Sequence, residues 1–183
     1  MSILKVNTIQ DKGGNAIISS DGSGTLTPNS ALATGVLANT PAFLAYQSSN
    51  QGINDNAYSI IQANTEVYDT DNAYNNSTYT FTVPSGKAGK YIFYYAAELE
   101  HSNKFREAWV GLYVNGSQDN IGAAYIYTGT SDVLGNFGGN NTVVKNLSAG
   151  DTVSAYAYLN TGANSAGQVK QYRSFFGGHR LGS

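Results

Sequence analysis

The sequence contains no cysteine, one tryptophan, one methionine and three prolines among its 183 residues. The absence of cysteine excludes disulfides, thiolate chemistry and zinc–sulfur sites. The two histidines, His101 and His179, leave little material for acid–base catalysis or metal binding. The one plausible nucleophile would be a serine activated by His179, and the sequence lacks the Gly-x-Ser-x-Gly motif that carries such a serine in hydrolases. The composition therefore predicts a protein that is not an enzyme and that has no cofactor.

Charged residues are also scarce. Asp, Glu, Lys and Arg make up 12% of the chain, about half the usual share, and the net charge is -2. Such a surface offers no basic patch for a nucleic acid or an anionic membrane. No stretch approaches the roughly 20 apolar residues of a membrane helix, and the first five residues lack the layout of a secretory signal. We expect neither a nucleic-acid partner nor membrane insertion.

The sequence is instead rich in tyrosine (14), glycine (21) and small polar residues. Aromatic and β-branched residues suit half-buried strands, and glycine and asparagine suit the turns between them. Few windows have the alanine, leucine, glutamate and lysine content of stable helices. The predicted fold class is all-β.

The chain divides into two parts near Pro41. Residues 3–9 and 16–20 read as short strands around the turn signal of residues 11–15. Residues 21–41 contain no aromatic side chain and cannot build a core alone, which is typical of an extended arm that a partner orders. We therefore assign residues 1–40 to an N-terminal arm that docks onto other proteins, and residues 41–183 to a globular head.

The head shows short, regularly punctuated strands and no internal repeat. Apolar or alternating runs occupy residues 42–46, 66–68, 78–83, 91–97, 109–114, 121–127, 142–147, 152–159 and 172–181. A hairpin turn is indicated by Asn115-Gly116, and a glycine- and asparagine-rich loop is expected between residues 128 and 141. This spacing predicts a β-sandwich or jelly roll.

Residues 98–107 allow two interpretations. Glu100 and Lys104 have the spacing of a helical ion pair. A hairpin with the loop 101–103 would instead set Glu100 opposite Lys104 and Leu99 opposite Phe105, which pairs opposite charges and apolar side chains. We favour the hairpin. In it, Glu98 and Glu100 are solvated turn charges and not an acid–base pair.

Six segments of the head together resemble the C1q/TNF-like jelly-roll family, a group of compact trimeric heads. They are AFLA at 42–45, YNNSTYTFTVP at 74–84, GKYIF at 89–93, VGLYVNG at 110–116, LSAGDTV at 147–153 and SFFGGHRL at 174–181. The match spans roughly residues 42–181 in order. Two features depart from the family: Tyr79 stands where it usually has glycine, and no collagen-like stalk precedes the head.

The resemblance implies a homotrimer, and the residues suggest where its subunits meet. The run 91–97 is apolar on both faces, so a neighbouring subunit is expected to cover one of them. In residues 152–159 the small side chains should face the core, leaving Tyr156 and Tyr158 for a neighbour or for sugar rings. The predicted interface residues are Tyr91, Phe93, Tyr95, Tyr156, Tyr158 and Phe175; Tyr125 and Tyr127 are candidate glycan contacts.

Asp69 and Asp71, with Asp55 nearby in sequence, are oxygen ligands of the kind that Ca²⁺ takes, and the resemblance is to a family with some calcium-binding trimers. Aspartate in turns is the preferred interpretation, so these residues are weak metal candidates.

Residues 3–11, ILKVNTIQD, resemble the first residues of marine phage virion proteins, especially fibres and appendages. The resemblance implies a virion protein assembled in the bacterial cytoplasm. Three functions follow: a trimeric fibre tip or appendage that attaches to the host surface through a glycan or a protein, a capsid-decorating trimer without a receptor role, and a polysaccharide-degrading tailspike. We favour the first function and keep the second as the alternative. The third is disfavoured, because a tailspike normally carries clustered carboxylates on a long β-helix and this sequence shows no such repeat.

Overall fold

The computed structural model describes residues 7–20, 22–23, 26–28, 40–162 and 165–182, with only the backbone of residues 26, 28 and 103. These residues fall into two units, Met1–Ala38 and Asn39–Ser183. The boundary between the units lies two residues before the one that the sequence suggests.

The N-terminal unit is a small antiparallel sheet in the order β1-β2-β3, formed by Thr8–Gln10, Ala16–Ser20 and Leu26–Pro28. The turn between β1 and β2 is built on Asp11, whose Oδ1 accepts hydrogen bonds from the amides of Gly13 (2.8 Å) and Asn15 (2.9 Å). The Asn15 side chain also donates to this carboxylate, which lowers the pKa of Asp11. The predicted strand 16–20 is confirmed; residues 3–6 of the other predicted strand lie outside the described residues.

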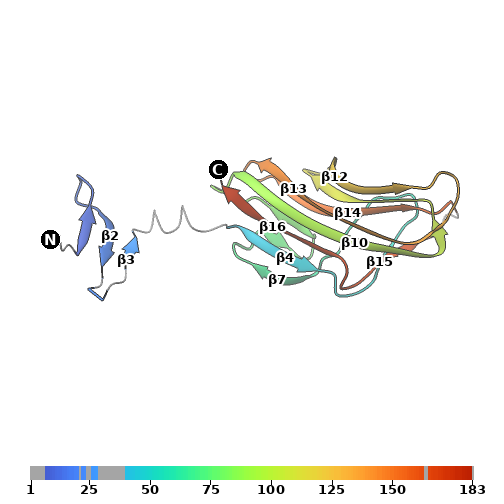
Figure 1. The fold of residues 1–183 in the computed structure, drawn as a ribbon, viewed down its shortest axis with the longest axis horizontal. Helices are drawn as coiled ribbons and strands as arrows, with labels where there is room; N and C mark the ends of the chain where they lie inside the picture. Colours follow the sequence, from blue (N-terminus) through green and yellow to red (C-terminus); the bar gives the residue numbers. More distant parts are fainter. Residues whose placement is uncertain (1–6, 21, 24–25, 29–39, 163–164, 183) are drawn as a thin grey trace, which may run out of the picture. The chain divides into compact units, whose positions relative to one another are not determined.

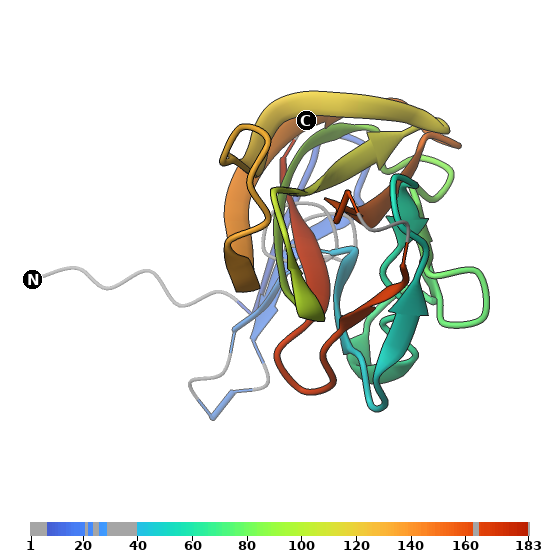
Figure 2. The same cartoon turned by 90° about the vertical axis from the view of Figure 1, so that its right-hand side faces the viewer.

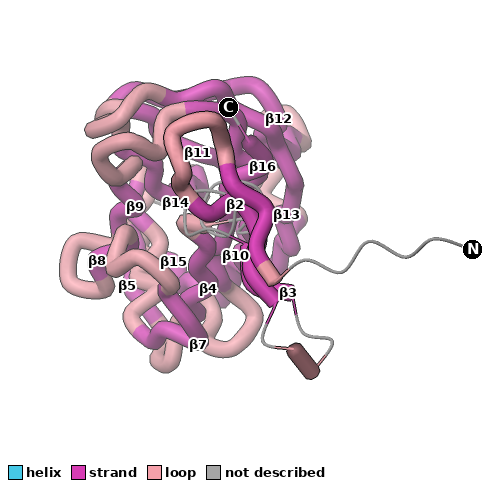
Figure 3. The backbone as a smooth tube through the Cα atoms, turned by 90° about the vertical axis from the view of Figure 1, so that its left-hand side faces the viewer, coloured by secondary structure: helices cyan, strands magenta, loops and turns pink. Residues whose placement is uncertain are grey.

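The head consists of strands joined by loops (Figure 3). The strands are β4 (Ala42–Tyr46), β5 (Gln51–Ile53), β6 (Ser59–Ile60), β7 (Thr65–Asp69), β8 (Tyr74–Asn75), β9 (Thr80–Thr82), β10 (Gly89–Phe105), β11 (Glu107–Val114), β12 (Ser117–Tyr127), β13 (Leu134–Leu147), β14 (Thr152–Asn160), β15 (Gly167–Val169) and β16 (Phe175–Gly182). Within the described ranges, no helix is long and apolar enough to cross a membrane.

Two antiparallel sheets face each other in the head (Figures 1 and 2). The seven-stranded sheet has the order β5-β15-β10-β16-β4-β7, with β13 also paired to β10. The six-stranded sheet has the order β12-β11-β14-β9-β8, with β6 also paired to β14. The 17-residue strand β10 organises the first sheet, because it pairs with β13, β15 and β16.

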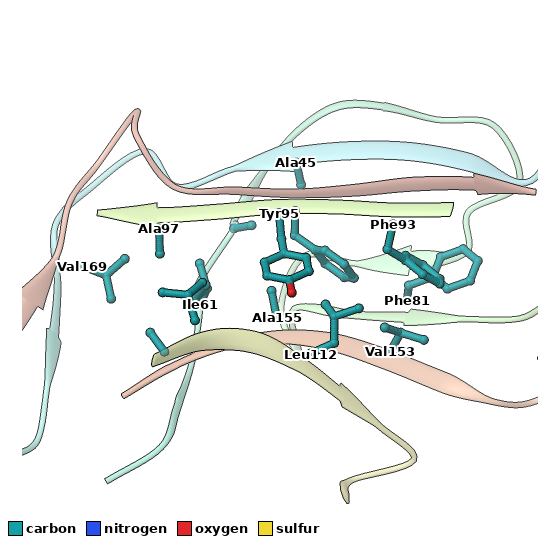
Figure 4. Packing of buried hydrophobic residues seen from close by; sticks show 14 of the residues in the cluster. Ala45, Ile61, Phe81, Phe93, Tyr95, Ala97, Leu112, Val153, Ala155 and Val169 are labelled. Carbon is teal, nitrogen blue, oxygen red and sulfur yellow. The ribbon is translucent and has the colours of Figure 1, made fainter. Parts of the chain in front are cut away.

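The core lies between the sheets and follows from strict alternation along the strands. In β10, Tyr91, Phe93, Tyr95, Ala97 and Leu99 are all fully buried and point toward the six-stranded sheet. Figure 4 shows Phe93, Tyr95 and Ala97 facing small and branched side chains of the opposite sheet, Leu112, Val153 and Ala155; Ala157 belongs to the same buried cluster. Large side chains on one sheet facing small ones on the other give a filled, ordered interior.

The hairpin predicted at Asn115-Gly116 is confirmed. These two residues have φ angles of 52° and 76° and connect β11 to β12, with Val114 paired to Ser117. Positive φ at both positions is the type I′ geometry, whose twist matches the flanking strands. The strand predicted at 42–46 is also confirmed with the same limits.

The hairpin predicted at residues 98–106 is wrong. The strand β10 continues through this window to Phe105, with a left-handed residue at Lys104 (φ 66°), and the chain then crosses to the other sheet at Arg106. Glu98 pairs with Arg173 and Glu100 with Lys170, both from the segment after β15. The sequence pattern fits either pairing, and only the tertiary fold brings these distant cations to β10.

Of the glycine- and asparagine-rich loop predicted at residues 128–141, residues 128–133 do form a loop, whereas residues 134–141 are part of a strand. β13 begins at Leu134 and pairs with β10 along its whole length. Gly139 lies opposite Ala97, where a Cβ would overlap Val110 and Phe137. Glycine is therefore required at position 139 for close packing, although the glycine- and asparagine-rich composition of this segment is typical of turns.

The family's usual glycine at position 79 has a physical explanation in this fold. Tyr79 has a φ of 57° in the tight turn before β9, so the predicted strand 78–83 is shortened to Thr80–Thr82. Glycine adopts this left-handed conformation without strain, whereas tyrosine does so at a cost.

The buried tyrosines predict alkaline unfolding. Burial raises the pKa of Tyr91 and of Tyr95 from the ordinary value of 10 to about 12. Because the folded state favours the neutral phenols, their contribution to stability is complete below pH 10 and is lost as the pH rises through about 12. A titration followed by tyrosinate absorbance and circular dichroism should show these phenols ionising together with unfolding in this window. Ionisation of every tyrosine in a single step, with the fold intact above pH 12, would contradict this assignment.

Candidate functional site

The outer face of the seven-stranded sheet carries a continuous set of apolar side chains, which we call the apolar face. Its members alternate with the core residues of three neighbouring strands, and each is half-buried in the single subunit. They are Leu44 and Tyr46 of β4, Ile92, Tyr94 and Ala96 of β10, and Phe175 of β16. A sheet face of this kind is normally covered by another layer.

Tyr94 lies at the centre of the apolar face. Its ring lies over Gly177 of the neighbouring strand β16, where a Cβ would overlap it. The Tyr94 hydroxyl is hydrogen-bonded to that of Tyr68 on β7 at 3.0 Å. Burial, and then this hydrogen bond, raise the pKa of Tyr94. The phenol therefore stays neutral at physiological pH.

Charged side chains flank the apolar face but do not interrupt it along β10. The outward residues between Lys90 and Glu98 are Ile92, Tyr94 and Ala96. Glu98 is held by Arg173, with both carboxylate oxygens 2.7 Å from Nη1. The centre of the face can thus be covered by an apolar surface without burying an unpaired charge.

Three of the predicted interface residues lie in the core of the subunit and not on the apolar face. Tyr91, Phe93 and Tyr95 are at most 1% exposed and pack inside the subunit, so the prediction that they contact a neighbour is wrong. The outward residues of the same strand are Ile92 and Tyr94. A strand that is apolar on both faces gives no indication of which set points inward, and a shift of one residue exchanges the two. Phe175 does lie on the apolar face.

The other four predicted tyrosines lie together on the outer face of the six-stranded sheet. Tyr156 and Tyr158 of β14 and Tyr125 and Tyr127 of β12 flank β11, where Trp109 pairs with both Tyr125 and Tyr158. As predicted, Val153, Ala155 and Ala157 of β14 face the core. The two interpretations that the sequence leaves open, a subunit contact and a sugar contact, therefore concern a single surface.

Three further aromatic residues complete this surface, and the sequence interpretation missed them. Trp109 lies flat over Gly111, and Tyr113 stacks on Tyr156 with ring centroids 4.0 Å apart. Tyr58 stacks on Tyr158 at 4.7 Å and meets Trp109 edge-on at 5.2 Å. The alternation of Trp109, Gly111 and Tyr113 is visible in the sequence, whereas Tyr58 comes from a loop that no local pattern relates to them.

This aromatic cluster covers its own sheet. Tyr158 is 8% exposed, and its hydroxyl donates to Asn56 Oδ1 (2.8 Å) and Glu107 Oε2 (3.3 Å). The prediction that a neighbouring subunit covers Tyr158 is therefore wrong, because Tyr58 already does so. Tyr125 donates to Glu107 Oε1 (3.0 Å) and, like Tyr127, remains more than half exposed. Contacts of Tyr125, Tyr127 and Tyr156 outside the subunit remain predictions.

The carboxylates of the weak calcium candidates, Asp69 and Asp71, accept hydrogen bonds from the turn that contains them. Asp69 accepts hydrogen bonds from the amides of Asp71 (3.3 Å), Ala73 (3.1 Å) and Tyr74 (2.8 Å). Asp71 accepts from the Thr70 hydroxyl (2.6 Å) and lies 3.8 Å from the Lys87 ammonium. Over the described ranges, no three histidine or acidic side chains gather as a metal site.

The one serine–histidine hydrogen bond that the described residues show involves His101 and not His179. Ser165 Oγ and His101 Nε2 are 2.9 Å apart, and the imidazole is 5% exposed. This bond ties the segment before β15 to β10. His179 lies on the outer side of β16, 6.4 Å from the Tyr94 ring.

Comparison with solved structures places the head among known folds. The chain superposes on murine APRIL at pH 8.0 (TM-score 0.52, 13% identity, 76% of this chain and 98% of that one) and at pH 5.0 (0.50, 10%, 76% and 99%). The globular domain of the zebrafish complement 1qA protein gives a TM-score of 0.49 at 16% identity, over 78% and 98% of the two chains. No protein-family model and no curated protein matches the sequence. Together with the all-antiparallel sandwich, the superpositions on murine APRIL confirm the predicted fold class: the head has a C1q/TNF-like jelly-roll fold.

Proposed function

We propose that the chain is a non-enzymatic appendage subunit of a tailed phage particle, a homotrimeric head that contacts the host surface. The apolar face is the observation that carries the self-associating part of this proposal. It presents six apolar side chains on the outside of a sheet, in a protein with only 12% charged residues. Association of three heads through this face buries it in the way that closed, symmetric oligomers do.

Two further observations support the proposal. Residues 3–11 resemble the start of phage virion proteins, and the N-terminal sheet is a separate unit suited to docking on other virion proteins. The three glutamates at and after the end of β10 are held by partners: Glu98 binds Arg173, Glu100 binds Lys170, and Glu107 accepts from Tyr125 and Tyr158.

The oligomeric part is tested by the mass of the full chain in solution. Multi-angle light scattering at micromolar concentration should report three times 19.4 kDa. We expect the mass to persist at high salt, because an apolar interface is not screened. A stable monomer would refute the homotrimer.

A capsid-decorating trimer is the alternative, since it would use the same face and the same docking unit. Immunogold labelling of phage particles with an antibody against this chain distinguishes the two roles. Label at the tail supports host attachment, and label spread over the capsid supports decoration. Particles without label would contradict both.

A further inference from the structure

A polar hollow of about 420 Å³ opens where β10, β13 and the segment between β15 and β16 meet. Amide, charged and aromatic side chains line it: Asn50, Glu98, Glu100, Asn136, Lys170, Gln171, Tyr172 and Arg173. Asn136 lies opposite Glu100 in the β10–β13 ladder. The hollow is therefore built partly on rigid strands and partly on the loop of residues 170–174.

Buried polar groups hold this loop in place. Ser174 is fully buried; its hydroxyl donates to the Lys170 carbonyl (2.9 Å) and accepts from the Glu98 amide (3.3 Å). The carbonyl of Gln47, 1% exposed, accepts from the Tyr172 amide at 2.8 Å. Asn50 Oδ1 accepts from the Gln171 amide at 3.0 Å. The loop is thus preordered before any ligand arrives.

The loop presents an aromatic ring to solvent under backbone strain. Tyr172 is 68% exposed and has a φ of 59°, a left-handed conformation that a tyrosine rarely adopts. Its ring centroid is 6.1 Å from that of Tyr46. Strain of this kind concentrates at functional sites, and an exposed ring at the rim of a polar hollow contributes nothing to the core.

The charges in the hollow neutralise each other. Glu98 is paired with Arg173 and Glu100 with Lys170, each at 2.7 Å. A strongly charged ligand would have to break one of these pairs, which disfavours it. The amides of Asn136 and Gln171, with the free lone pairs of the paired carboxylates, offer donors and acceptors to an uncharged, hydroxyl-rich ligand.

We propose that this hollow binds an uncharged glycan, with a pyranose ring on Tyr172 and its hydroxyls on Asn136, Gln171 and Glu100. The apolar C–H face of a sugar ring suits an aromatic ring, and planar amides suit vicinal hydroxyls. The proposal deepens the attachment role proposed above and rests on it. Because Glu98 follows Ala96 on the same face of β10, the hollow adjoins the apolar face. A trimer then carries three glycan sites, and their weak affinities combine.

Saturation-transfer NMR on the full chain tests the proposal with maltotriose, mannotriose, galactotriose and tri-N-acetylchitotriose as neutral probes, and 3′-sialyllactose as the charged probe. We expect at least one neutral probe to bind. Tyr172→Ala and Asn136→Ala should each weaken that binding by about tenfold or more. The control is Ile121→Ala, which trims a 73% exposed side chain on the other sheet and should change nothing; Tyr127→Ala removes the other candidate sugar contact, and binding should persist in it.

Three outcomes would overturn the proposal: no neutral probe binds at millimolar concentration, only the charged probe binds, or Tyr172→Ala leaves the affinity unchanged. Loss of binding in Tyr127→Ala but not in Tyr172→Ala would place the site on the aromatic cluster and also refute it. Circular dichroism and light scattering on each variant show that folding and mass are unaltered. Light scattering and immunogold labelling test the homotrimer and the virion location separately. If either of those proposals fails, sugar binding by the chain can still be measured.

Discussion

The substitution Ile92→Asp should convert the proposed trimer into monomers without unfolding the head. Ile92 points outward from β10 and is half-buried in the single subunit, so an aspartate there stays solvated in the monomer. In a trimer joined through the apolar face, the same carboxylate is removed from water at each interface, with His179 of β16 and Val144 of β13 as its neighbours across the two ladders. Taking a carboxylate out of water costs several kcal/mol per site, and three symmetric copies multiply the cost.

Multi-angle light scattering checks this expectation. The mass should fall from three times 19.4 kDa to 19.4 kDa, and the circular dichroism of the monomer should be that of the parent chain. Tyr127→Asp is the matched control, because it adds the same charge to an exposed position, 57% exposed, on the other sheet. If Ile92→Asp remains trimeric while Tyr127→Asp dissociates, the subunits meet through the six-stranded sheet and our assignment of the interface is wrong.

The sequence predicted the strands well wherever a strand and its partner are joined by a short turn. The β11–β12 hairpin follows from Asn115-Gly116 alone, because both residues tolerate the positive φ that the turn requires. Family motifs distributed along the chain were sufficient for the fold class. These signals are local, or are ordered along the chain, and neither needs the tertiary structure.

The errors share one physical cause, which is that pairing across the sandwich is not encoded locally. The sequence predicts a hairpin at the end of β10 because Glu98 and Glu100 have cations nearby in sequence, whereas Arg173 and Lys170 reach them in space. The sequence places the interface at Tyr91, Phe93 and Tyr95 because β10 is apolar on both faces. Only the opposing residues Leu112 and Ala155 decide which set is inside.

Truncating Phe43 should remove much of the stability of the head. Its side chain is fully buried, and its ring stacks on Tyr74 and on Phe81 with centroids 4.9 Å apart in both cases. It also meets Phe176 edge-on at 5.0 Å, so one ring joins β4, β8, β9 and β16. Phe43→Ala loses this burial and leaves a cavity between two sheets that cannot close on it. The expected loss is about 3–5 kcal/mol, a large part of the 5–15 kcal/mol typical of a domain.

Urea denaturation measures this loss in the free energy of unfolding. All variants must be compared at one protein concentration, because the stability of a trimer depends on it. The control Tyr127→Ala also removes an aromatic ring, from an exposed position, and should change the free energy of unfolding by no more than about 0.5 kcal/mol. A loss below about 1 kcal/mol for Phe43→Ala would mean that the stacked rings do not form the centre of the core. A loss in the expected range, with the control unchanged, would locate that centre where β4 meets the six-stranded sheet.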